Sequence, residues 1–219
     1  MAAAPDNGIK TGVIFDLDGT LWDSSYQVGI AWGEIFEKYS VGIPVTKERM
    51  AVMMGRTIPE IGEAILPHIG IEKRNEILKA CCAEEVRRLN LCGGQLFDGV
   101  EELMPELAKR YTLFIVSNCE DGYIQSFLNY HKMWPYVADI ECIGRTGLHK
   151  GENIKLVCER NGLQKAVYVG DTKRDMDSAH FAGLPFIHAA YGFGKGFEPE
   201  YSMASFRELP DLLKTVFKE

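Results

Sequence analysis

The fold is decided near the start of the chain, by the stretch Gly12-Val-Ile-Phe-Asp-Leu-Asp-Gly-Thr-Leu21. Apolar residues run straight into two acids and a Gly-Thr pair, which is typical of a short buried parallel strand that stops at a turn. In an open α/β sheet, ligands bind just beyond the carboxyl ends of the strands. Asp16 and Asp18 stand there on the same side of an extended chain. Like charges this close repel unless a cation or a shared proton holds them. The stretch therefore indicates a charged site, and the alternative is one helix-capping acid beside a solvated one.

Bulk composition limits the classes of function. The 219 residues are 46% hydrophobic and 25% charged, as in ordinary globular proteins, and suffice for a core with a smaller inserted domain. A net charge of −7 without a basic stripe argues against nucleic-acid binding. No apolar run approaches the roughly 20 residues of a membrane span. Residues 1–7 lack the basic and apolar regions of a secretory signal. We therefore expect a short disordered lead on a cytoplasmic protein.

The cysteines form no Cys-x-x-Cys pair, and most lie in apolar or helical stretches. This pattern predicts reduced, packed thiols and argues against a zinc site. They are Cys81, Cys82, Cys92, Cys119, Cys142 and Cys158.

A block without a convincing strand follows the first strand. Its apolar spacing predicts helices over about 24–40, 46–54, 57–68 and 72–90. Thr46 and Thr57 look like helix starts, the second with a proline just inside. The Gly-Gly pair before Gln95 predicts a flexible junction. We expect a mobile all-helical cap over residues 23–93, inserted into a core of residues 1–22 and 94–219. The alternative is a helical bundle packed permanently on the sheet.

Strands and helices alternate after the junction. Strands are predicted over 111–116, 137–143, 166–170 and 184–189, and helices over 101–110, 121–130, 150–161 and 174–182. Such alternation is typical of a parallel sheet covered by helices through right-handed crossovers. We therefore expect an α/β, Rossmann-like core.

Two further positions carry polar side chains that suit an anion such as phosphate. Ser117 and Asn118 close an apolar strand, where hydroxyl, amide and free backbone N–H groups suit a phosphate oxygen. An ordinary turn or helix cap is the alternative. Lys150 opens a helix, and a cation there is unfavourable unless an anion lies beside it. A surface lysine is the alternative, and His149 and Lys155 are rival candidates.

A second acidic motif follows the strand over 166–170. Asp171 ends that strand, and Asp175 follows four residues later on one helical face. Asp177 fits this spacing less well and is expected to be solvated. Mg²⁺ prefers a few carboxylates, waters and substrate phosphate, so these acids predict a magnesium site.

Four segments resemble, in order, the motifs of the haloacid dehalogenase-like (HAD) hydrolases, a superfamily made up mostly of phosphatases. They are Asp16-Leu-Asp-Gly-Thr20, Ser117, Lys150 and Gly170-Asp-Thr-Lys-Arg-Asp175, and the resemblance runs from about Gly12 to Gly196. The resemblance implies that Asp16 is the nucleophile and Asp18 the general acid/base. One departure is Gly151, where the family commonly has proline after the lysine.

The resemblance also assigns ligands. It implies that Ser117, Asn118 and Lys150 bind the phosphate. It implies Mg²⁺ held by Asp16, by Asp18 through its main-chain carbonyl and by Asp171, with Asp175 in support. The expected activity is hydrolysis of a small phosphomonoester through an aspartyl-phosphate, by a monomer or homodimer.

The substrate is the least determined part of this expectation. The helical cap and the Val-Gly-Asp-Thr segment resemble the phosphoglycolate-phosphatase branch. Arg56 and Lys195 are candidate substrate ligands, and exposed loop positions are their alternative. A nucleotide or sugar phosphatase would differ only in the cap, and a sugar-phosphate mutase would share all four motifs. A non-catalytic binding or regulatory protein on the same fold is the remaining alternative.

Overall fold

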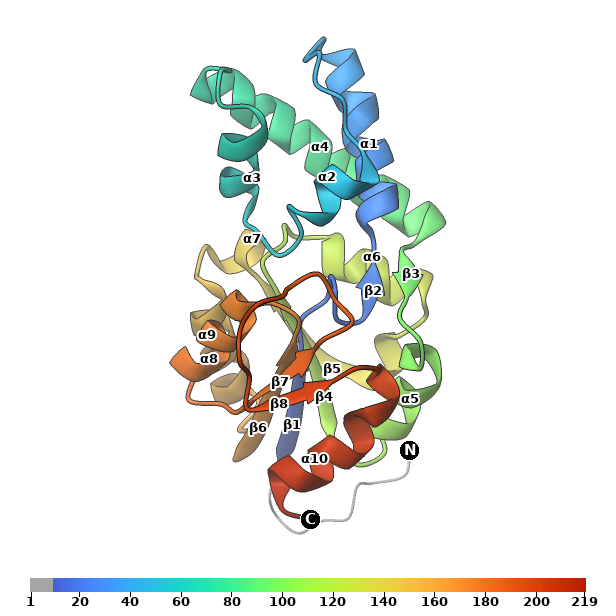
Figure 1. Cartoon of the computed structure of the whole chain (residues 1–219), viewed down its shortest axis with the longest axis vertical. Coiled ribbons are helices and arrows are strands. Elements are labelled where there is room, and N and C mark those ends of the chain that lie inside the picture. Colours follow the sequence, from blue (N-terminus) through green and yellow to red (C-terminus); the bar gives the residue numbers. More distant parts are fainter. Residues whose placement is uncertain (1–9) are drawn as a thin grey trace.

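The computed structural model describes residues 10–219, so the lead over residues 1–7 lies outside the described residues. A six-stranded sheet has the order β5-β4-β1-β6-β7-β8, and a block of helices stands over one end of it (Figure 1). Every neighbouring pair of strands runs parallel. The predicted α/β architecture with a helical insertion is therefore confirmed.

The first strand lies at the middle of the sheet because its residues are apolar on both sides. Val13 pairs with Leu113 of one neighbour and Val167 of the other. The strands are β1 (Thr11–Phe15), β4 (Thr112–Ser117), β5 (Val137–Cys142), β6 (Lys165–Gly170), β7 (Phe186–Ala189) and β8 (Tyr201–Met203). Four expected strands match these bounds to within two residues. The expected strand over 137–143 ends one residue early, because Ile143 begins the short helix α7 (Ile143–Thr146).

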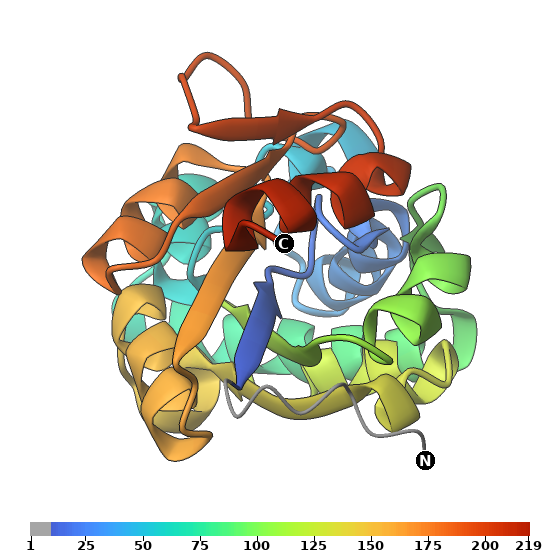
Figure 2. The ribbon, with the colours of Figure 1, turned by 90° about the horizontal axis from the view of Figure 1, so that it is seen from below.

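Two layers of helices cover the sheet, as the view from below shows (Figure 2). Alternate residues of β1 point to opposite faces, so Phe15 joins one apolar core and Ile14 the other. Helices α8 (Lys150–Arg160) and α9 (Lys173–Phe181) cover the Ile14 face. The Phe15 face is covered by α5 (Val100–Leu107), α6 (Tyr123–Tyr130) and α10 (Leu209–Phe217).

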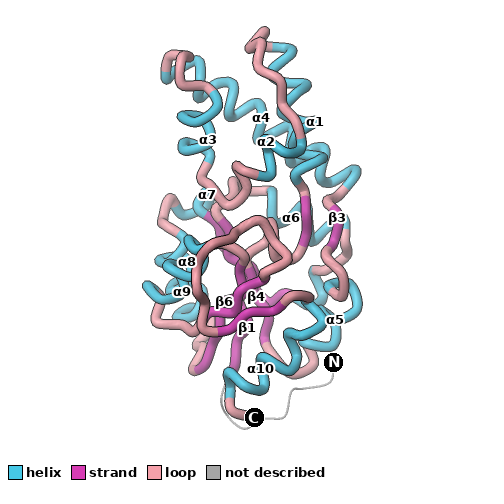
Figure 3. Tube along the Cα trace, in the orientation of Figure 1, coloured by secondary structure: helices cyan, strands magenta, loops and turns pink. Residues whose placement is uncertain are grey.

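Between residues 24 and 94 the chain contains helices and loops only (Figure 3). The helices of this insertion are α1 (Ser25–Lys38), α2 (Lys47–Ala51), α3 (Ile58–Ile65) and α4 (Ile71–Cys92). Thr46 caps α2, and Thr57 forms a capping box with Glu60 at α3, as their positions predicted. The second and third helices are shorter than expected and end in turns. Within α4, the apolar residues Cys82 and Val86 are only partly buried, whereas the acidic Glu85 is buried.

A two-stranded ribbon joins the insertion to the sheet. β2 (Trp22–Asp23) pairs antiparallel with β3 (Gln95–Leu96), so both crossings of the chain lie side by side. Strands of two residues are too short to show an alternation of apolar and polar residues, so they could not be predicted from the sequence. A Cβ at Gly94 would lie 2.7 Å from the Trp22 ring, so a glycine lets the two crossings approach.

Two sequence expectations concern the chain as a whole. The six cysteines are free thiols, of which Cys81 and Cys142 are buried and Cys92 is exposed. Among the described residues, no helix combines the length and the apolar character that crossing a membrane requires.

Candidate active site

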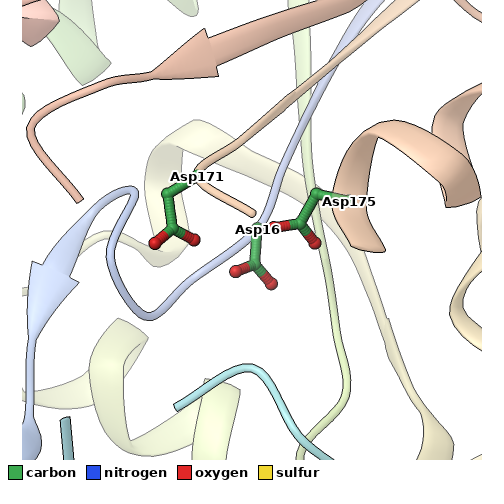
Figure 4. A group of neighbouring side chains, drawn as sticks. All are labelled: Asp16, Asp171 and Asp175. Carbon is green, nitrogen blue, oxygen red and sulfur yellow. The ribbon is translucent and has the colours of Figure 1, made fainter. Parts of the chain in front are cut away.

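Three carboxylates meet at the carboxyl ends of the central strands. Asp16 follows β1, and its N–H donates to the Val169 carbonyl at 2.8 Å. Asp171 follows β6, and Asp175 lies in the first turn of α9. One oxygen from each carboxylate lies within 4.8 Å of the others, and each residue is 1% exposed (Figure 4). The fold thus brings together three acids that two separate motifs predicted.

Lys150 supplies the positive charge beside this cluster. Its ammonium donates to Asp16 Oδ1 at 2.8 Å and to Asp175 Oδ1 at 2.6 Å. Although burial lowers the pKa of Lys150, its two carboxylate partners raise that pKa well above the ordinary value. The rival candidates point elsewhere, since His149 is exposed and the Lys155 ammonium lies over the Phe181 ring.

The departure at Gly151 has a packing explanation. Helix α8 begins at Lys150, and its second residue faces α9. A Cβ at Gly151 would lie 2.6 Å from Phe181 Cδ1. A proline would therefore clash with the neighbouring helix, while glycine leaves the position of Lys150 unchanged.

The acid cluster fits a divalent cation. Asp171 Oδ2 accepts from the N–H groups of Phe193 at 2.7 Å and Gly194 at 3.3 Å. Its buried Oδ1 has no hydrogen-bond partner among residues 10–219. Burial, with Asp175 and Asp16 nearby, raises the pKa of Asp171 well above its usual value. A hard cation with oxygen ligands would satisfy this atom and offset the repulsion among the acids.

Tight backbone packing holds Asp171 in place. Gly19 has a φ of 81°, in the left-handed region, and a Cβ there would lie 2.2 Å from Asp171 Oδ2. Gly19 is therefore needed both for the turn and for the close approach of Asp171.

Asp18 lies apart from the three-carboxylate cluster, on the side of the insertion. Its Oδ1 accepts hydrogen bonds from Ser24 Oγ at 2.6 Å and from the Tyr123 hydroxyl at 3.0 Å. Burial raises the pKa of Asp18 to about 7, a value suited to giving and taking protons near neutral pH. Neither hydroxyl could be predicted from the sequence, because Ser24 opens the insertion and Tyr123 comes from α6.

A cavity extends from Asp18 to the insertion. Ser117 is buried at the end of β4, and the Asn118 side-chain amide donates to the Gly55 carbonyl of the insertion at 3.1 Å. Arg56 also lines the cavity, but Lys195 does not, and its ammonium donates to the Ala190 carbonyl. The lining residues are Asp18, Val28, Trp32, Met50, Met53, Met54, Gly55, Arg56, Ile58, Ile61, Glu85, Ser117, Asn118, Cys119, Glu120 and Tyr123.

Comparison with known proteins agrees with this geometry. The model of a family described as haloacid dehalogenase-like hydrolase matches residues 13–189. The phosphoglycolate phosphatase of Photorhabdus laumondii is 28% identical over 236 residues, covering 99% of this chain and 96% of the relative. The enzyme of the same name from Escherichia coli K12 is 26% identical over 235 residues, with 94% and 92% covered.

Solved structures share the fold. A protein described as a predicted phosphoglycolate phosphatase from Haemophilus somnus superposes with a TM-score of 0.81 at 18% identity, covering 95% of this chain and 100% of that one. A haloacid dehalogenase-like protein from Streptococcus pneumoniae gives 0.80 at 22% identity, with 93% and 98% covered. At these identities the likeness concerns the fold alone.

Proposed function

The chain belongs to the haloacid dehalogenase-like hydrolases, and from this premise we propose that it is a magnesium-dependent phosphatase acting on small phosphomonoesters. The observation that carries the proposal is the pairing of two unlike acids. Asp16 lies against the Lys150 ammonium and two further carboxylates, while Asp18, two residues on, is held by hydroxyl groups. One acid is thus placed for attack and the other for proton transfer.

The proposed reaction has two steps. An Asp16 oxygen attacks phosphorus, and the bond from phosphorus to the ester oxygen breaks while Asp18 gives that oxygen its proton. Asp18, now ionised, then takes a proton from the water that attacks the aspartyl-phosphate, which releases phosphate and restores Asp16. In both steps Lys150 stabilises charge beside Asp16, and Ser117 and Asn118 hold phosphoryl oxygens.

We assign Mg²⁺ to Asp16, Asp171, Asp175 and the main-chain carbonyl of Asp18. The unpartnered Oδ1 of Asp171 supports this assignment. When bound, the ion would neutralise charge on the phosphoryl oxygens.

The insertion serves in this proposal as a cap domain over residues 23–93, above a core of residues 1–22 and 94–219. Its support is the narrow ribbon joint and the cavity that both parts line. Phosphoglycolate is a candidate substrate because distant relatives carry that name. Arg56 is a candidate ligand for its carboxylate.

The test is phosphate release from a panel of small phosphomonoesters, with Mg²⁺ and with a chelator. We expect magnesium-dependent turnover that Asp16→Asn abolishes. Asp98→Asn is the matched control, because Asp98 is exposed, pairs with Arg207 and does not belong to the carboxylate cluster. Near wild-type turnover by Asp16→Asn would refute the proposal.

A further inference from the structure

Glu85 is a buried carboxyl that the proposed chemistry does not use. It lies on α4 of the insertion, is 8% exposed and lines the cavity together with Asp18. Its Oε2 accepts from the Trp32 indole N–H at 2.6 Å. Its Oε1 makes no hydrogen bond within residues 10–219 and is not fully buried, so this oxygen is accessible to a ligand in the cavity that Glu85 lines.

The surroundings of Glu85 favour a cation as that ligand. Burial, reinforced by the charges of Asp18 and Glu120, raises the pKa of Glu85 to about 8. Much of the remaining lining is apolar. The one cation in the lining is Arg56, which forms no ion pair within residues 10–219 and none with Glu85. A positive group beside Glu85 would offset the cost of burying its charge.

The contact with Trp32 does not by itself require an acid. A glutamine at position 85 would offer the indole N–H the same acceptor oxygen. Only the acid can lose its proton beside a bound cation and so place negative charge on the second oxygen, in a cavity already lined by Asp18 and Glu120. A substrate carboxylate placed there would meet three acids.

The position and the volume of the cavity limit the size of the ligand. Asp18 is the proposed acid for the leaving oxygen, so the leaving group extends into the cavity that Glu85 lines. This cavity has a volume of about 40 Å³, which at roughly 10–15 Å³ for each water is room for about three water molecules. A leaving group of a few heavy atoms fits.

We propose that Glu85 binds a primary ammonium group on the leaving group, so that small phosphomonoesters of amino alcohols are the preferred substrates. This inference rests on the proposed phosphatase function and sharpens its substrate class. Glu85 is thus the specificity-determining residue of the insertion, and Trp32 orients its carboxylate.

A matched two-carbon series tests the proposal. The esters are 2-aminoethyl phosphate, 2-hydroxyethyl phosphate, ethyl phosphate and phosphoglycolate, which place an ammonium, a hydroxyl, a methyl and a carboxylate at the same position. For the wild type, kcat/KM for the ammonium ester should exceed that for ethyl phosphate by about 10- to 100-fold, as expected of a charged hydrogen bond. Phosphoglycolate, whose carboxylate only Arg56 could bind in this lining, should be turned over less efficiently than 2-aminoethyl phosphate.

The variants are compared by the ratio of kcat/KM for 2-aminoethyl phosphate to that for ethyl phosphate. Glu85→Gln keeps the acceptor for Trp32 and should bring this ratio below about 3. Glu84→Gln makes the same charge change on the same helix, but Glu84 pairs with Arg87 and does not line the cavity. It should keep the wild-type ratio.

The outcomes separate this inference from the proposed function. Turnover with phosphoglycolate preferred, or an unchanged ratio in Glu85→Gln, would overturn the ammonium site and leave the phosphatase standing. Absence of turnover on every ester would count against the phosphatase. Calorimetric binding of 2-aminoethyl phosphate would then decide: weaker binding to Glu85→Gln than to Glu84→Gln supports the ammonium site, and equal binding overturns it.

Discussion

The core and the insertion contribute to one cavity in different ways. At the strand ends, Asp16, Lys150 and Asp175 bind one another and form a closed charged network. From the insertion, Arg56 and one oxygen of Glu85 line the cavity without charged partners among residues 10–219. The paired strand-end groups, which with Asp171 form the proposed metal site, suit chemistry common to many substrates. The groups of the insertion that lack charged partners suit the binding of a particular substrate. We therefore expect the reaction and the choice of substrate to depend on different parts of this molecule.

The largest effect is expected from breaking the core network at Lys150. Lys150→Gln leaves Asp16 and Asp175 without their cation, so turnover should fall by about 10²-fold or more. The free energy of unfolding of the metal-free protein should fall by about 3–5 kcal/mol. Phosphate release and urea unfolding measure the two effects. Lys155→Gln on the same helix should lose little, and equal losses in both variants would show that Lys150 has no special role.

The next effect concerns the metal. Mg²⁺ at 100 times its Kd should stabilise the wild type by about 2.7 kcal/mol, because it satisfies the unpartnered Oδ1 of Asp171. Thermal unfolding with and without Mg²⁺ measures this gain. Asp171→Asn should lose it, while Asp177→Asn should keep it because Asp177 is exposed and pairs with Lys173. If Mg²⁺ stabilised Asp171→Asn as much as the wild type, the metal would have to bind elsewhere.

The third prediction concerns Glu85 of the insertion and the pH dependence of the free energy of unfolding. Burial first, then Asp18 and Glu120, raise the pKa of Glu85 to about 8, against roughly 4.3 when unfolded. Between these values the folded protein binds one proton more, so Glu85 lowers stability by up to about 1.4 kcal/mol for each pH unit gained. The gain in unfolding free energy from Glu85→Gln should therefore be larger at pH 8 than at pH 5.

Urea unfolding of both proteins at the two pH values measures this difference. All other ionisable groups contribute equally to the unfolding free energies of wild type and variant, so their pH dependence cancels in the difference. Glu84→Gln is again the control, and its effect should not grow with pH. A pH-independent effect of Glu85→Gln would mean that Glu85 is ionised throughout this range.

The smallest effect is expected at an ion pair between the core and the insertion. Arg174 of α9 pairs with Glu60 of α3 at 2.8 Å, and both side chains are at least partly exposed. An exposed pair contributes at most about 1 kcal/mol and is screened by salt. Glu60→Gln should therefore change KM by less than about 5-fold, and the change should vanish near ~1 M salt. Glu63→Gln, on the exposed side of the same helix, should have no such salt-dependent effect.

The sequence predicted the core better than the insertion for a physical reason. Apolar strands end at one edge of a parallel sheet, so acids placed after β1 and β6 must meet. Lys150 was found from its unfavourable place at a helix start. Both arguments need only local patterns and the topology that those patterns imply.

The groups that reach the cavity from other elements left no such pattern. Tyr123 is one aromatic residue on the amphipathic helix α6, and only the packing of α6 brings its hydroxyl to Asp18. Glu85 interrupts the apolar face of α4: the spacing from Cys81 to Leu89 puts position 85 inward, but a single acid there gives no sequence signal of burial. Its burial depends on Trp32, 53 positions earlier in the chain. Contacts of this kind follow from tertiary packing alone.

The most direct test of the account is to trap the aspartyl-phosphate. The enzyme is mixed with substrate and Mg²⁺ and quenched in acid within one turnover, and its peptides are examined by mass spectrometry. We predict a magnesium-dependent phosphoryl group on the peptide over residues 11–38, at Asp16, and none in Asp16→Asn. Phosphate release without any labelled peptide, continuing in Asp16→Asn, would contradict the account.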